Sequence, residues 1–93
     1  MGRLPVTMQV NVVVIDPRNP KNVYAAGPAG IFRSTDAGLT WEVRNAGLNP
    51  ANFTALTVNP QKPDTMFAMT AEGVLYRSDD RALNWKSVPT KTP

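Results

Sequence analysis

The residues that could do chemistry in this sequence are carboxylates, hydroxyls and amides, because the chain contains neither cysteine nor histidine. It therefore has no thiolate nucleophile, no disulfide, no Ser-His-Asp triad and none of the commonest zinc ligands. Hydrolytic or acid–base chemistry would rest on the seven carboxylates, which are Asp16, Asp36, Glu42, Asp64, Glu72, Asp79 and Asp80.

The spacing of these carboxylates does not indicate a catalytic pair. Cleavage of a glycosidic bond needs two carboxyl groups that face each other across the sugar. Asp36 and Asp80 instead recur 44 residues apart in matching segments. Asp16 and Asp64 stand beside prolines, where turn capping explains a carboxylate. The sequence also lacks a regular calcium loop and a phosphate-binding glycine loop before a helix. We expect no catalytic residue, no metal site and no cofactor.

The segments that hold these residues belong to an internal repeat. Pro20 and Pro63 are 43 residues apart, whereas Trp41 and Trp85 are 44 apart. The change in spacing places one extra residue of the second copy in the turn between residues 68 and 77. Two copies cover nearly the whole chain, which indicates an architecture built by repeating one supersecondary unit.

Each copy is expected to form four short strands and no helix. The sequence predicts strands over 8–15, 22–26, 31–34, 40–44, 53–58, 65–69, 74–78 and 84–88. The connections are too short for parallel crossovers, so neighbouring strands must be antiparallel. A repeated four-stranded unit of this length is typical of a β-propeller blade. We predict an all-β chain, a single unit over 1–93, with blade one at about 5–48 and blade two at about 49–93.

A motif within the repeat resembles the Asp box, or BNR repeat, of sialidase, sortilin-type, xyloglucanase and photosystem II assembly propellers. The first copy fits Ser-x-Asp-x-Gly-x-Thr-Trp at all five defined positions, with Ser34, Asp36, Gly38, Thr40 and Trp41. The second copy is degenerate and keeps only Ser78, Asp80 and Trp85.

The chemistry expected of this motif is structural. The carboxylate of Asp36 can accept N–H groups of the following turn, and Gly38 can adopt a positive φ. Trp41 offers an apolar plate to pack between neighbouring sheets. Ala82 replaces the glycine in the second copy, so that hairpin is expected to be looser or to use another turn. The resemblance also places Asp boxes at the periphery, away from active sites. A sialidase would need an arginine cluster and a nucleophilic tyrosine, and the sequence indicates neither.

If the chain binds a ligand, we expect the site on the face opposite the two Asp boxes. The second-to-third strand turns and the link between the copies should meet there, and a glycan or a protein is the expected ligand. The candidate segments are residues 27–30, 45–51 and 71–73, and the candidate residues are Gly27, Gly30, Asn49, Glu72 and Gly73.

Charge and hydropathy exclude other partners. Ten basic and seven acidic residues give a net charge of +3, and no two basic residues are adjacent. No polybasic patch indicates a nucleic acid or a membrane surface. The sequence shows no signal peptide, and its longest apolar run, Val12 to Ile15, is too short to span a membrane. We expect a soluble protein, whose compartment the sequence leaves open.

Both faces of the expected sheets carry apolar residues, so two blades alone would leave two apolar faces exposed. A head-to-tail interface that closes into a ring would cover them. We therefore predict a non-enzymatic scaffold or binding module that forms a homo-oligomer, with four chains favoured slightly over three. Two alternatives stay open. One is a fragment of an Asp-box glycoside hydrolase with its catalytic residues elsewhere, and the other is a designed or evolutionary-model two-blade unit.

Overall fold

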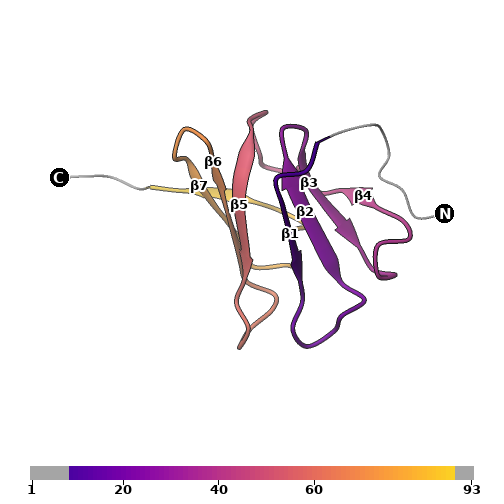
Figure 1. Cartoon of the computed structure of the whole chain (residues 1–93). Helices are drawn as coiled ribbons and strands as arrows, with labels where there is room; N and C mark the ends of the chain where they lie inside the picture. Colours follow the sequence, from indigo (N-terminus) through magenta and orange to yellow (C-terminus); the bar gives the residue numbers. More distant parts are fainter. Residues whose placement is uncertain (1–8, 90–93) are drawn as a thin grey trace.

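The computed structural model describes residues 9–89, and these form two four-stranded antiparallel sheets without a helix. The strand order follows the chain in each sheet, so every connection within a sheet is a hairpin. The predicted all-β fold of two antiparallel blades is confirmed (Figure 1). Blade one contains β1 (Val12–Ile15), β2 (Val23–Gly27), β3 (Gly30–Ser34) and β4 (Glu42–Val43). Blade two contains β5 (Phe53–Val58), β6 (Met66–Thr70), β7 (Leu75–Ser78) and β8 (Lys86–Val88).

The predicted strands agree with the structure at their centres and differ at some ends. The last strand of each blade was predicted from residues 40 and 84, but β4 begins at Glu42 and β8 at Lys86. The reason is local, because Thr40 N and Asn84 N donate to the carboxylates of Asp36 and Asp80 rather than to the sheet. The expected first strand began at residue 8, which lies outside the described residues, and β1 begins at Val12.

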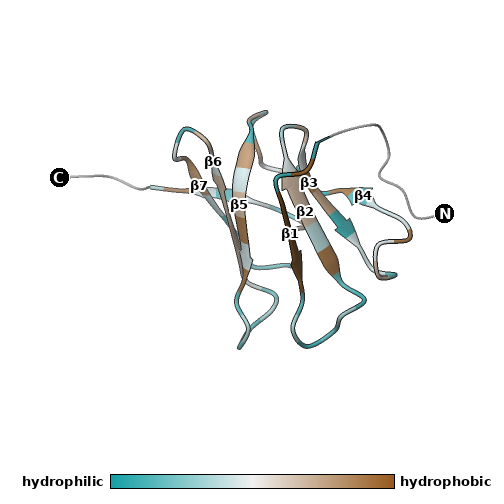
Figure 2. Ribbon diagram, in the orientation of Figure 1, coloured by the Kyte–Doolittle hydropathy of each residue, from teal (hydrophilic) through white to brown (hydrophobic). Residues whose placement is uncertain are grey.

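The two sheets pack face to face around one shared core. β5 of blade two lies against β1 and β2 of blade one (Figure 1). Blade one contributes Tyr24, Ala26 and Ile31 to this core, each with essentially no exposed surface. Blade two contributes its own buried side chains, which include Phe53, Leu56, Met66, Ala68, Tyr76, Ala82 and Trp85. Figure 2 shows β1 as a strongly apolar strand, consistent with its sequence of three valines and an isoleucine.

The chain crosses from blade one to blade two through a tight link at Gly47. This glycine has φ +90°, and a Cβ atom there would collide with the carbonyl oxygen of Trp85. Just before the glycine, the carbonyl oxygen of Ala46 accepts a hydrogen bond from Trp85 N at 2.9 Å. The link therefore fixes the position of the last strand of blade two relative to blade one.

The extra residue of the second copy lies where the spacing predicted it. Gly27 pairs with Gly30 across a tight β2–β3 turn. In blade two the corresponding β6–β7 turn is longer, and Thr70 N donates to the carbonyl oxygen of Val74 at 3.0 Å. The two turns are therefore not equivalent, although the strands around them are.

Candidate functional site

The carboxylate of Asp36 is fully engaged in the turn between β3 and β4. It accepts hydrogen bonds from Ser34 Oγ (2.7 Å), from Thr40 N (2.8 Å) and from Thr40 Oγ1 (2.6 Å). Ser34 Oγ in turn accepts from Gly38 N at 2.8 Å. The hydrogen bonds from Thr40, followed by that from Ser34, lower the pKa of Asp36 to about 2. This ionised group closes a turn and has little capacity left for substrate chemistry.

The turn between β7 and β8 repeats this arrangement bond for bond. Asp80 accepts from Ser78 Oγ (2.8 Å), Asn84 N (2.9 Å) and Asn84 Nδ2 (3.0 Å), and Ala82 N donates to Ser78 Oγ (2.9 Å). The hydrogen bonds from Asn84 lower the pKa of Asp80. The expectation of a different turn here was wrong. The serine and aspartate bonds hold Ala82 at φ 72°, and the Asn84 amide replaces the threonine hydroxyl.

The two motif tryptophans occupy different environments. Trp85 is 3% exposed in the shared core, and its Nε1 donates to the carbonyl oxygen of Arg44 in blade one at 3.0 Å. Trp41 is only partly buried, and its Nε1 donates to Gly38 O of its own turn at 3.1 Å. The predicted role between sheets is thus filled by Trp85, because within residues 9–89 blade two follows another blade and blade one does not.

Four of the five remaining carboxylates are also accounted for by local contacts. Buried Asp16 accepts from Arg18 N at 2.9 Å and so caps the β1–β2 turn. Three others form ion pairs, and Glu72 lies exposed in the β6–β7 turn. Within residues 9–89 no cluster of three or more acidic residues could hold a metal ion. The ion pairs are Glu42–Arg44, Asp79–Arg77 and Asp64–Arg81.

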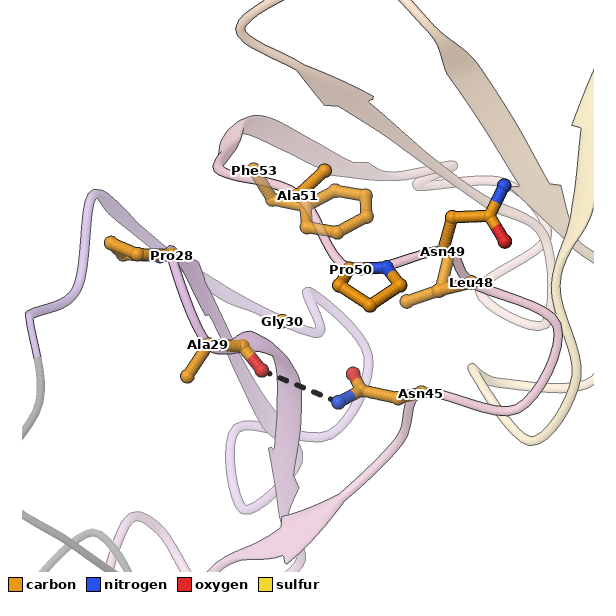
Figure 3. A pocket seen from close by; sticks show the side chains of 9 residues that line it. All are labelled: Pro28, Ala29, Gly30, Asn45, Leu48, Asn49, Pro50, Ala51 and Phe53. Carbon is orange, nitrogen blue, oxygen red and sulfur yellow. Dashed lines mark hydrogen bonds between the residues drawn. The ribbon is translucent and has the colours of Figure 1, made fainter.

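A cavity of about 320 Å³ opens between the blades (Figure 3). It lies at the edge opposite the β3–β4 and β7–β8 turns, which contain Asp36 and Asp80 and are called the aspartate turns. Two of the three segments predicted for a ligand face meet there. Residues 28–30 form one wall, Asn45 and residues 48–51 form the other, and Phe53 also lines the cavity. The third segment, residues 71–73, reaches the same edge but does not line the cavity (Figure 1).

The candidate residues of this face have uneven roles. Asn49 lines the cavity, but its side-chain amide points away from the opposite wall (Figure 3), and its N–H donates to Tyr76 Oη. Gly30 has φ +115°, and a Cβ atom there would strike the side chain of Asn45. Gly27 lies close to the backbone of Gln9. These two glycines are required by close packing, and Gly73, at φ +93°, faces open space.

Asn45 was not singled out from the sequence, although it organises the cavity. Its Oδ1 accepts from Ile31 N at 2.8 Å, and its Nδ2 donates to Ala29 O at 3.3 Å, the bond drawn in Figure 3. The sequence signal for this role was an asparagine directly after the predicted strand 40–44. These bonds tie the link between the blades to the β2–β3 turn and set the width of the cavity mouth.

The outer faces of the two blades form a second candidate surface. On blade two, the exposed face includes Phe67 and Met69, with the guanidinium of Arg77 5.7 Å from the centre of the Phe67 ring. On blade one, the outer face exposes Val13 and Ile15 on β1, both over one half exposed. Val43 on β4 is also exposed, whereas Ala25 and Phe32 between these strands are buried.

Comparison with known proteins supports the fold alone. No protein-family model and no curated protein matches the sequence. Among solved structures, an ancestral GH74 enzyme is similar with a TM-score of 0.77 and 13% identity over 86% of this chain. The chain covers 12% of that enzyme. At this identity the likeness shows that the sheets have the blade fold of a propeller.

No helix able to cross a membrane is found among residues 9–89.

Proposed function

We propose that this chain is a non-enzymatic β-propeller module of the Asp-box type, and that copies of it assemble head to tail into a closed ring. The hydrogen bonds of the two aspartate turns support the Asp-box assignment, because they give the motif residues the structural role expected of them. The same bonds argue against catalysis by Asp36 or Asp80. The ion pairs of Glu42, Asp64 and Asp79 likewise argue against a catalytic role for these carboxylates.

One observation carries the proposal of a ring. The exposed face of blade two is the repeat equivalent of the blade-one face that is buried in the core. Tyr24 and Arg33 form a stacked pair on that buried face, with the guanidinium 5.8 Å from the ring centre. Phe67 and Arg77, their equivalents 43 and 44 residues later, form the same pair on the exposed face of blade two.

Likewise, the exposed outer face of blade one is the repeat equivalent of the blade-two face that is buried in the core. Leu56 is buried on the blade-two face that meets blade one, and Val58 is partly buried there. Their equivalents are Val13 and Ile15, which are exposed on the outer face of blade one. A second copy can therefore repeat the internal packing by placing its blade one against the exposed face of blade two. Such an interface is heterologous, so it forms a ring when the rotation closes.

The number of chains follows from two blades per chain. Three chains give six blades and four give eight, and both lie within the roughly four to eight blades of known propellers. A seven-bladed ring would need half a chain. We favour four chains slightly over three.

Native mass spectrometry tests the assembly directly. The expected result is a species of ~30 or ~40 kDa, three or four times the chain mass of 10.1 kDa. Phe67→Asp or Val13→Asp should leave monomers, because the first removes the aromatic ring that the interface would bury beside Arg77 and the second would bury an unpaired charge. Lys62→Glu, on the exposed β5–β6 turn, is the matched control and should assemble normally. A folded monomer for the parent chain at high concentration would refute the ring.

The cavity between the blades is the proposed ligand site of this module. None of its nine lining residues is charged, which favours an uncharged group of a glycan or a protein. Pro28→Ser and Leu48→Ser should weaken binding of a ligand found by screening, whereas Glu72→Ala should not, because Glu72 lies outside the cavity. Equal losses from all three variants would place the ligand elsewhere.

The alternative of a glycoside hydrolase fragment has its support in the likeness to the ancestral GH74 enzyme. That likeness concerns the fold of 12% of the enzyme, and the carboxylates of Asp36 and Asp80 are engaged in their own turns. Assays on xylogluco-oligosaccharides and sialyl substrates separate the two functions. Turnover that survives Asp36→Asn and disappears on removal of another carboxylate would favour the enzyme. The origin of the chain as a designed or evolutionary-model unit is a separate question, which a near-identical multi-copy parent gene would answer.

A further inference from the structure

The junction between the blades of one chain shows which contacts a junction between chains would need. Trp85 lies in that internal junction, and its indole reaches across to the chain leaving β4, where it donates to Arg44 O. Its own backbone N–H donates to Ala46 O in the same segment. The aspartate turn before Trp85 holds it in place, since Asn84 N and Nδ2 are both bound to Asp80.

Trp41 is the equivalent residue of blade one, and it lacks such a neighbour within residues 9–89. Its indole lies over its own turn, where Nε1 donates to Gly38 O and Cζ2 would contact a Cβ atom at Gly38 at 3.8 Å. The preceding turn is built as in blade two, because Thr40 N and Oγ1 are bound to Asp36. Trp41 therefore follows the same hydrogen-bonded aspartate turn as Trp85 but is only partly buried.

This inference rests on the proposed ring. We propose that Trp41 becomes buried in the junction with a second copy of this chain, as Trp85 is buried in the internal junction. Its indole N–H leaves the carbonyl of Gly38 and donates to the main-chain carbonyl of Val88 of the second copy. Val88 is the counterpart of Arg44 at the 44-residue spacing that relates Trp41 to Trp85. It ends β8 and is part of the described chain, where it pairs with Leu75.

Leu39 supplies a matched control within the same turn. Leu83, its equivalent in blade two, remains 49% exposed although the neighbouring Trp85 is buried in the internal junction. Leu39, now 57% exposed, should accordingly stay exposed when a second copy docks. A substitution at Leu39 should thus leave assembly unchanged, whereas a substitution at Trp41 should not.

The test combines tryptophan emission with assembly. A chain with Trp41 as its only tryptophan, made by Trp85→Phe, should show a blue shift in emission as protein concentration rises, because the indole becomes buried. A chain with only Trp85, made by Trp41→Phe, should show no shift. If Trp85→Phe fails to fold, the two indole N–H signals of the parent in an NMR spectrum give the same information, with only that of Trp41 moving on dilution.

The affinity of the copies for one another gives an independent readout. Trp41→Phe keeps a large aromatic ring and loses one hydrogen bond, so the dissociation constant between copies should rise about five- to tenfold. Trp41→Ala removes the plate and should raise it about a hundredfold or more. Leu39→Ala should change it less than about twofold.

The outcomes separate this inference from the ring itself. A ring detected by native mass spectrometry in which Trp41 emission is unchanged, or in which Trp41→Ala assembles normally, would overturn the role of Trp41 and leave the ring standing. A chain that stays monomeric at every concentration would overturn the ring and this inference together.

Discussion

At the scale of single residues, each aspartate turn depends on a serine hydroxyl and a carboxylate that share the backbone N–H groups of the turn. Ser34 and Ser78 are almost completely buried, and each bonds to the aspartate two residues later and to an N–H four residues later. This pair of side chains holds non-glycine residues at positive φ, as at Ala37 (63°) and Arg81 (60°). The turn is therefore specified by side-chain bonds more than by glycine.

The depressed pKa of Asp36 predicts a stability change in acid. Its folded pKa of about 2 lies below the ordinary value of 3.8, so its ionised form stabilises the folded chain. That contribution is fully present above pH 3.8 and is lost as the pH falls toward 2. The difference in melting temperature between the parent and Asp36→Asn should be constant near neutrality and shrink across this window.

Glu72→Gln is the control for this measurement, since Glu72 is exposed in a turn, and its melting temperature should match that of the parent at each pH. Asp80 is present in both chains and so does not affect the comparison. A difference between the parent and Asp36→Asn that stayed the same down to pH 2 would mean that the charge of Asp36 does not stabilise the turn.

At the scale of elements, the strands were predictable because the repeat gives two sequence examples of each strand. Apolar runs bounded by prolines, glycines and aspartates located β1 to β3 and β5 to β7 to within a few residues. The starts of β4 and β8 were not predictable from β-propensity, since Thr40 and Asn84 are drawn into the turn by the carboxylates.

Two glycines with nearly the same φ give a prediction about packing. Gly47 lies in the link between the blades, and Gly73 lies in the β6–β7 turn. Gly73, at +93°, faces open space, so Gly73→Ala should cost about 1 kcal/mol of unfolding free energy for the left-handed backbone alone. Gly47, at +90°, lies against Trp85 O, so Gly47→Ala should cost about 1–3 kcal/mol more through overpacking. Urea denaturation of both variants measures the difference. Equal costs would show that the contact between Gly47 and Trp85 is not tight in solution.

At the scale of the whole molecule, the blade pair has an apolar face on each side, and the proposed ring predicts that stability depends on assembly. The two sheets share one core, and their outer faces expose Val13, Ile15, Val43 and Met69. Association of folded chains stabilises them by mass action. The melting temperature of the parent should therefore rise when its concentration rises from about 1 to about 100 µM. Phe67→Asp should melt at a temperature that does not depend on concentration, and a parent that behaves like it would argue against assembly.

The site was predictable in part, and the reason lies at this larger scale. The topology of a blade places residues 28–30 and 45–51 on one edge, so hairpin order alone predicted that they meet. The amide of Asn45 bridges the two segments through a rotamer that no sequence pattern specifies. Likewise, the different burial of Trp41 and Trp85 depends on which neighbour each blade has, and the two motifs do not encode that difference.

The unequal length of the β2–β3 and β6–β7 turns limits the symmetry of any ring built from this chain. If copies close as proposed, blades alternate between a turn with Pro28 and a longer turn with Glu72, so the rotational symmetry matches the number of chains, not of blades. Cavities with the Pro28 and Asn45 walls would then occur once per chain, all on one face. A ligand with several copies of the recognised group would meet three or four identical sites, and its avidity would report the valency of the ring.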